Sequence, residues 1–400
     1  MGGLLDFLNH GLLGLGLGAK AVVLFVFVQI SMAGVTLYLH RDQAHRAIDL
    51  HPALRHFFRL WIWLTSGMVT REWVAVHRKH HALCEQPGDP HSPVIFGLRT
   101  VLTQGAELYR VDAHDPEVVA KYGRGTPDDW LERNLYSQYS TVGIYTTLFL
   151  NVLLFGVIGI TMFAVQMMAM PVFAAGVING LGHARGYRNF ESADAATNLT
   201  PVALLIGGEE LHNNHHAFPS SAKFSVQPWE FDIGWLYISL LRPLGLCSVR
   251  RVAPRPVIAP APRTVDIDTL RAVLVNRMHV LRDYTRRVTL PVLDREAQQA
   301  PRRGLLAGAR DLLVRRPQLL DEAAHRRLAE VLAASATLRT VHEYRQQLVA
   351  VWEQANVSND QLVRQLREWC AKAEASGIEA LQEFSARLRG YLPESGPATA

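Results

Sequence analysis

Three tight clusters of histidine limit the folds open to this chain, because the ligands of a metal ion must meet around it. Eight of the 17 histidines belong to these clusters: His40 and His45 in HRDQAH, His77, His80 and His81 in HRKHH, and His212, His215 and His216 in HNNHH. Imidazole is the commonest metal ligand of proteins, and one tetrahedral zinc needs only four ligands. Eight clustered histidines therefore predict a pair of metal ions, held by segments that lie far apart in the sequence.

Apolar sequence lies before the first cluster and between the first and second clusters, and we expect only the part before the first cluster to cross a membrane. Residues 20–39 are nearly all apolar after Lys20, and about 20 residues span a bilayer core, so we expect a transmembrane helix here. Residues 53–70 are aromatic and apolar but carry Arg55 and Arg59. A crossing there would put the first two clusters on opposite faces of the membrane. We therefore expect this segment to lie in the interface or against the helical bundle.

Residues 143–182 form the longest apolar run, with about 40 positions, enough for two helices of about 20 residues. We expect a turn near Gly156 to Gly159. Such a hairpin leaves and returns on one face and brings the third cluster beside the second. Basic residues flank the clusters while the hairpin tip has none, so the positive-inside rule predicts that the clusters face the cytoplasm. These basic residues are Arg41, Arg46, Arg78, Lys79, Arg185 and Arg188.

After the apolar region the amino-acid composition of the chain changes. Residues 251–263 are proline-rich and predict a semi-rigid linker. Residues 264–400 are rich in Leu, Ala, Arg and Glu with helical periodicity. We therefore expect a membrane domain over 1–250 and a soluble helical region over 264–400, in which no motif points to chemistry. Helices are expected near 265–285, 318–334, 338–355, 359–372 and 377–391.

The net charge and the cysteine content argue against several classes of partner and of metal or disulfide site. The net charge of +5 and the pI near 9.2 are explained by basic residues beside apolar segments, where they anchor on lipid. We therefore expect no nucleic-acid partner. The three cysteines lie far apart, without a CxxC pair, so disulfides, zinc ribbons and iron–sulfur clusters are not expected.

Spacing within the clusters indicates how they bind metal. HRKHH and HNNHH share the spacing i, i+3, i+4, which lies on one face of an α-helix. His40 and His45 are five positions apart, about 140° around an α-helix. We expect either that they straddle the metal pair or that the helix opens at this end. Iron is favoured, because nitrogen ligands suit it and a redox site beside lipid suits oxidation of an unactivated C–H bond.

The order HxxxxH, HxxHH, HxxHH, split by a hydrophobic hairpin, resembles the membrane fatty acyl desaturases of the stearoyl-CoA desaturase type. The resemblance covers about residues 20–245, and the DPHSP loop is most similar to that of the bacterial members. Matching stretches outside the clusters are Glu72-Trp73, Asp89-Pro90-His91, Asn179-Gly180-Leu181-Gly182-His183, Gly186-Tyr187-Arg188, Gly208-Glu209 and Phe218-Pro219.

The resemblance implies an all-α integral membrane bundle with a cytoplasmic di-iron cap, located in the bacterial inner membrane. It implies that His183 is a ninth ligand and that Asn179 holds a metal-bound water. The implied reaction uses O₂ and two iron ions to introduce a cis double bond, at the ninth carbon, into a saturated fatty acyl chain carried as phospholipid or acyl-CoA. No flavin or NAD fingerprint is present. An external electron donor is therefore expected: a ferredoxin, a flavodoxin-like protein or a cytochrome b5-like protein with its reductase.

Other residues have two interpretations each. Trp73 either walls the acyl tunnel or packs as an ordinary aromatic side chain. Arg185 and Arg188 either meet an anionic head group or anchor the interface. Carboxylates near the clusters are candidates for orienting imidazole N–H groups. These are Glu209, Asp89 and Asp194.

Two other functions compete with desaturation. A membrane di-iron hydroxylase or monooxygenase acting on lipids or alkanes would share the histidine ligands and differ in forming an alcohol. A non-enzymatic metal transporter or scaffold would need ionisable residues within its spans, and the central spans are almost free of them.

Overall fold

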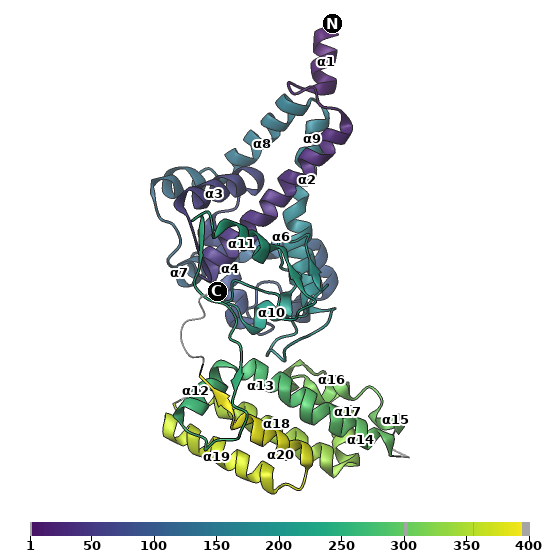
Figure 1. Cartoon of the computed structure of the whole chain (residues 1–400). Helices are drawn as coiled ribbons and strands as arrows, with labels where there is room; N and C mark the ends of the chain where they lie inside the picture. Colours follow the sequence, from purple (N-terminus) through teal and green to yellow (C-terminus); the bar gives the residue numbers. More distant parts are fainter. Residues whose placement is uncertain (1, 300–302, 355, 394–400) are drawn as a thin grey trace. The chain divides into compact units, whose positions relative to one another are not determined.

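Two compact units make up the chain in the computed structural model, which describes residues 2–299, 303–354 and 356–393. Unit 1 comprises Met1–Arg188 and Asp194–Ala253, and unit 2 comprises Asn189–Ala193 and Pro254–Ala400. The division after Ala253 falls inside the proline-rich segment. Both units are mainly helical (Figure 1), which agrees with the predicted all-α class.

The first long apolar helix of unit 1 runs from Leu17 to Ala44, and it is long and apolar enough to cross a membrane. It consists of α2 (Leu17–Ala33), which continues without a break as the π-helix η1 (Gly34–Ala44). Near its start Lys20 is buried, and its Nζ donates to the backbone oxygens of Asn9 and Phe155 at 3.1 and 2.8 Å. The charge is therefore hydrogen-bonded where this helix meets the tip of the next hairpin.

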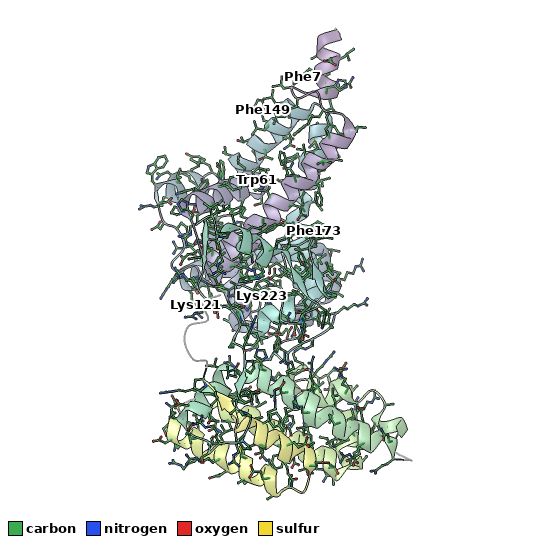
Figure 2. The ribbon with its side chains drawn as sticks, viewed as in Figure 1. Phe7, Trp61, Lys121, Phe149, Phe173 and Lys223 are labelled. Atoms are coloured by element: carbon green, nitrogen blue, oxygen red, sulfur yellow. The ribbon has the colours of Figure 1, made fainter. Side chains whose placement is uncertain are left out.

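That hairpin pairs α8 (Ser140–Phe155) with α9 (Ile158–Ala169). The turn requires Gly156, whose φ is 72° and whose Cβ, if present, would lie 2.4 Å from the backbone oxygen of Leu8. Apolar side chains point outward along the hairpin, as Phe149 does with 63% of its surface exposed (Figure 2). A hairpin whose outer surface is apolar suits a lipid environment.

Only one arm of this hairpin reaches the length of a full span. Together with the π-helix η3 (Met170–Ile178) and the 3₁₀ turn η4 (Leu181–His183), α9 forms a second helix able to cross a membrane. With 16 residues, α8 is shorter than the prediction of about 20. Two candidate spans, rather than three, are therefore present in the described residues.

The aromatic segment after the first cluster forms α3 (Pro52–Ser66), which packs against α8 and η1. Its Arg59 is buried, and its guanidinium pairs with Asp129 at 2.6 Å and with Glu132 at 2.8 Å. Such a paired arginine fits the prediction that this segment lies against the bundle instead of crossing the membrane alone.

Shorter elements complete unit 1 and bring distant segments together. The antiparallel pair β1 and β4 joins the residues after the first cluster to the end of the unit, with Ile48 opposite Val249. Residues 202–203 and 231–232 form a short parallel pair. The remaining elements are α1 (Gly2–His10), β1 (Ile48–Leu50), α4 (Thr70–Leu83), α5 (Pro93–Phe96), α6 (Leu98–Ala113), α7 (Pro116–Tyr122), η2 (Glu132–Tyr136), β2 (Val202–Ala203), α10 (His212–Ala217), β3 (Phe231–Asp232), α11 (Ile233–Leu241) and β4 (Cys247–Val249).

Unit 2 is a bundle of amphipathic helices with a continuous apolar core. At its centre the Tyr284 hydroxyl donates to the backbone oxygen of Val341 at 2.7 Å, and the Trp369 indole donates to that of Tyr344 at 2.9 Å. These two buried donors are thus satisfied, as is usual in a folded core. Its elements are β5 (Val257–Ile258), α12 (Ile267–Val275), α13 (Arg277–Tyr284), η5 (Thr285–Thr289), α14 (Leu290–Gln298), α15 (Arg303–Leu306), α16 (Arg310–Val314), η6 (Pro317–Leu319), α17 (Glu322–Ala334), α18 (Ala336–Glu353), α19 (Asn359–Ala375), α20 (Glu379–Leu388) and β6 (Tyr391–Leu392).

The helix predicted near 265–285 is divided at Asn276 into α12 and α13, and α14, α15 and α16 were not predicted. Two other predicted helices differ from the observed ones at their caps. The helix predicted near 318–334 begins at Glu322, because the Asp321 side chain caps it by accepting from Ala324 N. The helix predicted near 338–355 is capped earlier, by Ser335, and ends at Glu353, while residue 355 lies outside the described part of the chain. Within the proline-rich segment, β5 pairs with β6, so part of it is a strand of unit 2.

Candidate metal centre

The second and third clusters lie on helices whose geometry divides adjacent histidines between two groups. HRKHH is in α4 and HNNHH forms most of the short helix α10. Neighbouring side chains on a helix point about 100° apart, so adjacent histidines point in different directions. The first group combines His40, His45, His77, His81 and His215, and the second combines His80, Cys84, His183 and His216; each could hold a metal ion.

The distances within the first group are those of ligands facing one ion. Nε2 of His215 lies 3.0 Å from Nε2 of His40 and 3.0 Å from Nε2 of His81. Nε2 of His45 lies 2.8 Å from Nε2 of His77. Two nitrogens that each bind one metal at about 2.1 Å approach one another to about 3 Å. The first group therefore has the spacing of a coordination shell.

His212 extends the second group through His183. Their Nε2 atoms are 2.9 Å apart, and both rings lie within 5 Å of the His216 ring, centroid to centroid. His183 is the ninth ligand that the family resemblance implied. The structure brings it to the clusters through the turn η4, which follows the second candidate span.

The π-helix explains the spacing of the first cluster. In η1 the amide of His45 donates to the oxygen of His40 at 3.0 Å, an i to i+5 bond. A π-helix has a wider turn than an α-helix, so residues five apart lie nearly one above the other. The two rings are 4.9 Å apart, centroid to centroid. The separation of about 140° expected for an α-helix is therefore wrong here, and of the two predicted arrangements the opened helix is the one observed.

Carboxylates meet the outer nitrogen of four of these histidines. Each carboxylate accepts a hydrogen bond from the Nδ1–H of the ring. This bond leaves Nε2 directed toward the other rings and fixes the tautomer. The pairs are Glu209 with His40 at 2.7 Å, Asp89 with His80 at 3.0 Å, Asp194 with His216 at 3.0 Å, and Glu85 with His183 at 3.0 Å.

Glu85 was not predicted from the sequence. It follows α4 with a left-handed backbone (φ 62°), and that turn directs its carboxylate toward His183 at 3.0 Å and toward the amide of Ala195 at 2.7 Å. Its position four residues after His81 was the only available signal. Cys84 also escaped prediction: its Sγ lies 3.7 Å from Nε2 of His80.

Burial lowers the pKa values of several of the clustered histidines. Burial first, and neighbouring imidazoles second, hold the pKa values of His77, His81, His212 and His215 well below the usual range. Burial also lowers the pKa of His216 to about 4, although Asp194 opposes the change. Neutral imidazole is the form that binds metal.

Several buried nitrogens have no hydrogen-bond partner within the described residues. They include Nε2 of His216, Nδ1 of His212 and both ring nitrogens of His91. Unpaired buried polar atoms are rare in folded proteins, and a bound cation would satisfy those that face the cluster. The nitrogen-rich, neutral donor set therefore fits transition-metal ions such as iron.

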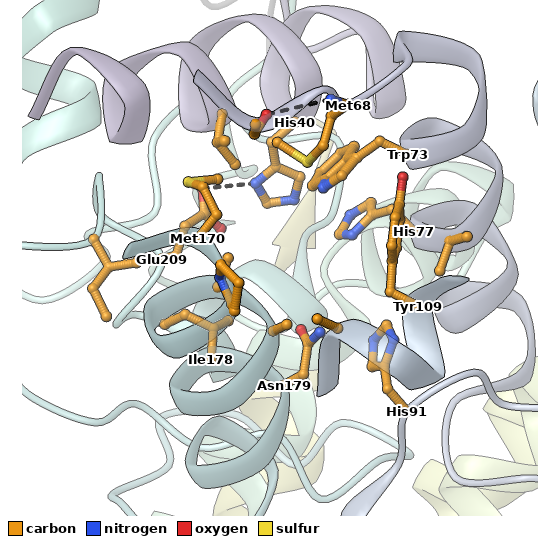
Figure 3. A pocket seen from close by; sticks show the side chains of 18 of the residues that line it. His40, Met68, Trp73, His77, His91, Tyr109, Met170, Ile178, Asn179 and Glu209 are labelled. Carbon is orange, nitrogen blue, oxygen red and sulfur yellow. Dashed lines mark hydrogen bonds and ion pairs between the residues drawn. The ribbon is translucent and has the colours of Figure 1, made fainter. Parts of the chain in front are cut away.

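An apolar cavity of about 300 Å³ adjoins the histidines (Figure 3). His40, His77, His80 and His212 line it, together with Asn179 and Glu209. Trp73 also lines it and stacks on the His77 ring, with centroids 4.9 Å apart and planes 11° apart. A hydrophobic molecule in this cavity would thus lie against the imidazoles.

The two predicted head-group arginines lie elsewhere. Arg185 is exposed and Arg188 is half-buried, and neither lines the cavity. The Arg188 guanidinium donates to the backbone oxygens of Asp194 and Ala196 at 2.9 and 2.7 Å. This places Arg188 beside the loop that carries Asp194, and its predicted contact with a head group stays a prediction.

Comparison with known proteins gives two family matches. A family model described as fatty acid desaturase matches residues 18–230. A model described as transposase matches residues 271–394, a minority of the chain. Among the described residues, the groups of side chains that could hold a metal all lie in unit 1, so we carry no activity over from the second match.

Three similar proteins illustrate the first match. Delta-9 acyl-lipid desaturase 1 of Arabidopsis thaliana is 30% identical over 58% of this chain and 74% of its own length. The sn-1 stearoyl-lipid 9-desaturase of Anabaena variabilis is 30% identical over 59% of this chain and 85% of its own. Acyl-CoA 5-desaturase AL21 of Anemone leveillei is 28% identical, over 56% of this chain and 69% of its own.

Proposed function

The chain belongs to the fatty acid desaturase family, and from this we propose that it introduces a cis double bond at the ninth carbon of a saturated acyl chain. The observation that carries this proposal is the apolar cavity, whose wall includes His40, His77, His80 and His212. An alkyl chain in this cavity would lie directly against the candidate metal ligands. The names of the Arabidopsis and Anabaena relatives refer to lipid-bound substrates, which favours a phospholipid over acyl-CoA as the acyl carrier.

We propose that nine histidines hold two iron ions. Iron bound there would supply the activation of O₂ that oxidation of an unactivated C–H bond needs. The reaction removes two hydrogens from adjacent methylenes and, with O₂, two external electrons and two protons, yields the alkene and two waters. Asn179 lines the cavity and is proposed to hold a metal-bound water. The nine ligands are His40, His45, His77, His80, His81, His183, His212, His215 and His216.

The surrounding side chains position and protect the site. Glu209, Asp89 and Asp194 are proposed to orient imidazoles through Nδ1, which supports the metal-facing Nε2 lone pairs. Trp73, stacked on His77, is proposed to form a wall of the acyl channel and to exclude water. Close confinement of the chain selects which pair of carbons meets the oxidant.

Location and electron supply follow from the same proposal. Two helices of the described residues are able to cross a membrane, and basic residues flank the histidine clusters. We propose insertion in a bacterial inner membrane with the histidines on the cytoplasmic side. Electrons would come from a separate ferredoxin, flavodoxin-like protein or cytochrome b5-like protein.

Expression in a host that lacks unsaturated fatty acids tests the reaction. Lipid mass spectrometry by lipid class should find a new cis alkene with wild type and none with His80→Ala. His114→Ala removes an exposed histidine and should behave as wild type. An alcohol product would instead identify a hydroxylase. Freshly isolated protein, never exposed to chelator, should contain about two equivalents of iron; absence of any transition metal would refute the proposal.

A further inference from the structure

Arg110 is a cation at the wall of the acyl cavity. It lies near the end of α6, lines the cavity and is exposed to solvent. In the described part of the chain its guanidinium makes no ion pair or hydrogen bond. Lys79, in contrast, is neutralised by Asp112, whose Oδ2 lies 2.7 Å from its Nζ. Arg110 is therefore available to an anion at the mouth of the cavity.

Exposed apolar side chains lie on α6 next to Arg110 and on the second candidate span. Val111 has 72% of its surface exposed, and Met168, on that span, has 56%. That span continues as η3, against which α6 packs so closely that a Cβ on Gly105 would meet the backbone oxygen of Ala175 at 2.7 Å. A cation beside lipid-facing side chains is costly unless an anion neutralises it. At a bilayer surface that anion is a lipid phosphate.

Tyr109 supplies a second polar contact, one residue away. Its ring lines the cavity (Figure 3), and its hydroxyl is buried without a hydrogen-bond partner among the described residues. A buried hydroxyl that faces a ligand site requires an acceptor. The ester carbonyl that joins an acyl chain to glycerol is such an acceptor, and it lies a few bonds from the phosphate.

We propose that Arg110 binds the phosphodiester of a bilayer phospholipid whose acyl chain fills the cavity, and that Tyr109 donates to the ester carbonyl. The guanidinium fork matches a phosphate with two parallel hydrogen bonds. This inference rests on the proposed function, because it assigns the carrier of the same acyl chain. It adds a head-group site apart from Arg185 and Arg188, neither of which lines the cavity.

Equilibrium binding of radiolabelled dipalmitoylphosphatidylglycerol to the full-length protein in detergent tests the site without reference to turnover. Dipalmitoylglycerol, which lacks the phosphate, and palmitoyl-CoA are measured in parallel. Wild type should bind the phospholipid most tightly. Arg110→Gln should weaken phospholipid binding about tenfold, the size of one charge-assisted contact, and leave dipalmitoylglycerol unchanged. Arg110→Lys should lie between the two, and Tyr109→Phe should weaken both ester-linked lipids.

Arg99→Gln is the matched control, since Arg99 is exposed on the same helix and does not line the cavity; it should bind all three ligands like wild type. Iron content and thermal unfolding establish that each variant is folded. Unchanged phospholipid affinity in Arg110→Gln would overturn the inference, as would tighter binding of palmitoyl-CoA that depends on Arg110. The proposed function fails separately, if wild type binds phospholipid but forms no alkene.

Discussion

Oε1 of Glu209 lies 2.7 Å from Nδ1 of His40, although 169 positions separate the two residues in the sequence. The same oxygen accepts from the Thr36 hydroxyl at 2.7 Å, and the whole group is buried. One carboxylate from the loop before the third cluster thereby fixes an imidazole of the first. These hydrogen bonds therefore hold the first cluster next to the segment that carries the third.

Glu209→Gln should loosen metal binding. The neutral amide no longer raises the basicity of the His40 ring, and loss of such an outer partner typically costs 10–100-fold in metal affinity. Competition with a chelator measures the affinity. Glu117→Gln, at an exposed carboxylate on α7, should leave it unchanged. Wild-type affinity in Glu209→Gln would exclude an orienting role.

Gly105→Val should separate the two helices that wall the cavity. Its Cβ would lie 2.7 Å from the Ala175 oxygen and 2.9 Å from the Ala175 carbonyl carbon, which are backbone atoms and cannot rotate away. Overpacking of this kind costs about 1–3 kcal/mol, so thermal unfolding should begin at a lower temperature and desaturation should fall. Gly18→Val is the comparison, because a Cβ there meets nothing within 4 Å. Equal destabilisation by both would show that the effect is not one of packing between α6 and η3.

Ile144→Phe should shift the preference toward shorter acyl chains. Ile144 is half-buried on α8 and lines the cavity, so a larger side chain reduces its volume. The ratio of unsaturated C14 to unsaturated C18 product, measured by mass spectrometry, should rise. Tyr145→Phe changes the adjacent side chain, which is 70% exposed, and should keep the wild-type ratio. An unaltered ratio in Ile144→Phe would mean that the acyl chain does not reach this part of the cavity.

Unit 2 should lose stability in mild acid. Burial, followed by Arg282, lowers the pKa of His279 to about 4, against 6.5 in an unfolded chain. The folded state therefore resists protonation and the unfolded state does not, so stability is full above pH 6.5 and is lost as the pH falls toward 4. Between pH 7 and pH 5 the loss should be about 2 kcal/mol.

Hydrogen exchange of α13, corrected for intrinsic rates, measures this loss in the full-length protein. His279→Gln should remove most of the pH dependence. His325→Gln changes an exposed histidine of the same unit and should preserve it. Protection of α13 that does not vary between pH 7 and pH 5 would contradict the prediction.

Much of the architecture follows from local pattern. Continuous apolar runs predicted the long helix through residues 20–39 and the hairpin around Gly156, because membrane-spanning helices need only length and apolarity. The spacing of HxxHH placed three imidazoles per turn on α4 without knowledge of any contact. The family was also predictable, and the match over residues 18–230 confirms it.

Other features had no local signal. The contact of Glu85 with His183 and the meeting of His80 with His183 and His216 depend on residues distant in sequence. Periodicity alone left two arrangements open for His40 and His45, because it assumes 3.6 residues per turn, whereas the chain forms a π-helix there.

The sequence by itself determined which residue types could bind metal, where apolar helices run, and to which family the chain belongs, since composition and period act over a few turns of chain. The tertiary structure decided how the histidines divide into two groups, which carboxylate orients which ring, and where the cavity opens. Those properties depend on side-chain directions at distances of about 3 Å, and they are set by the packing of segments separated in the sequence by up to 175 residues.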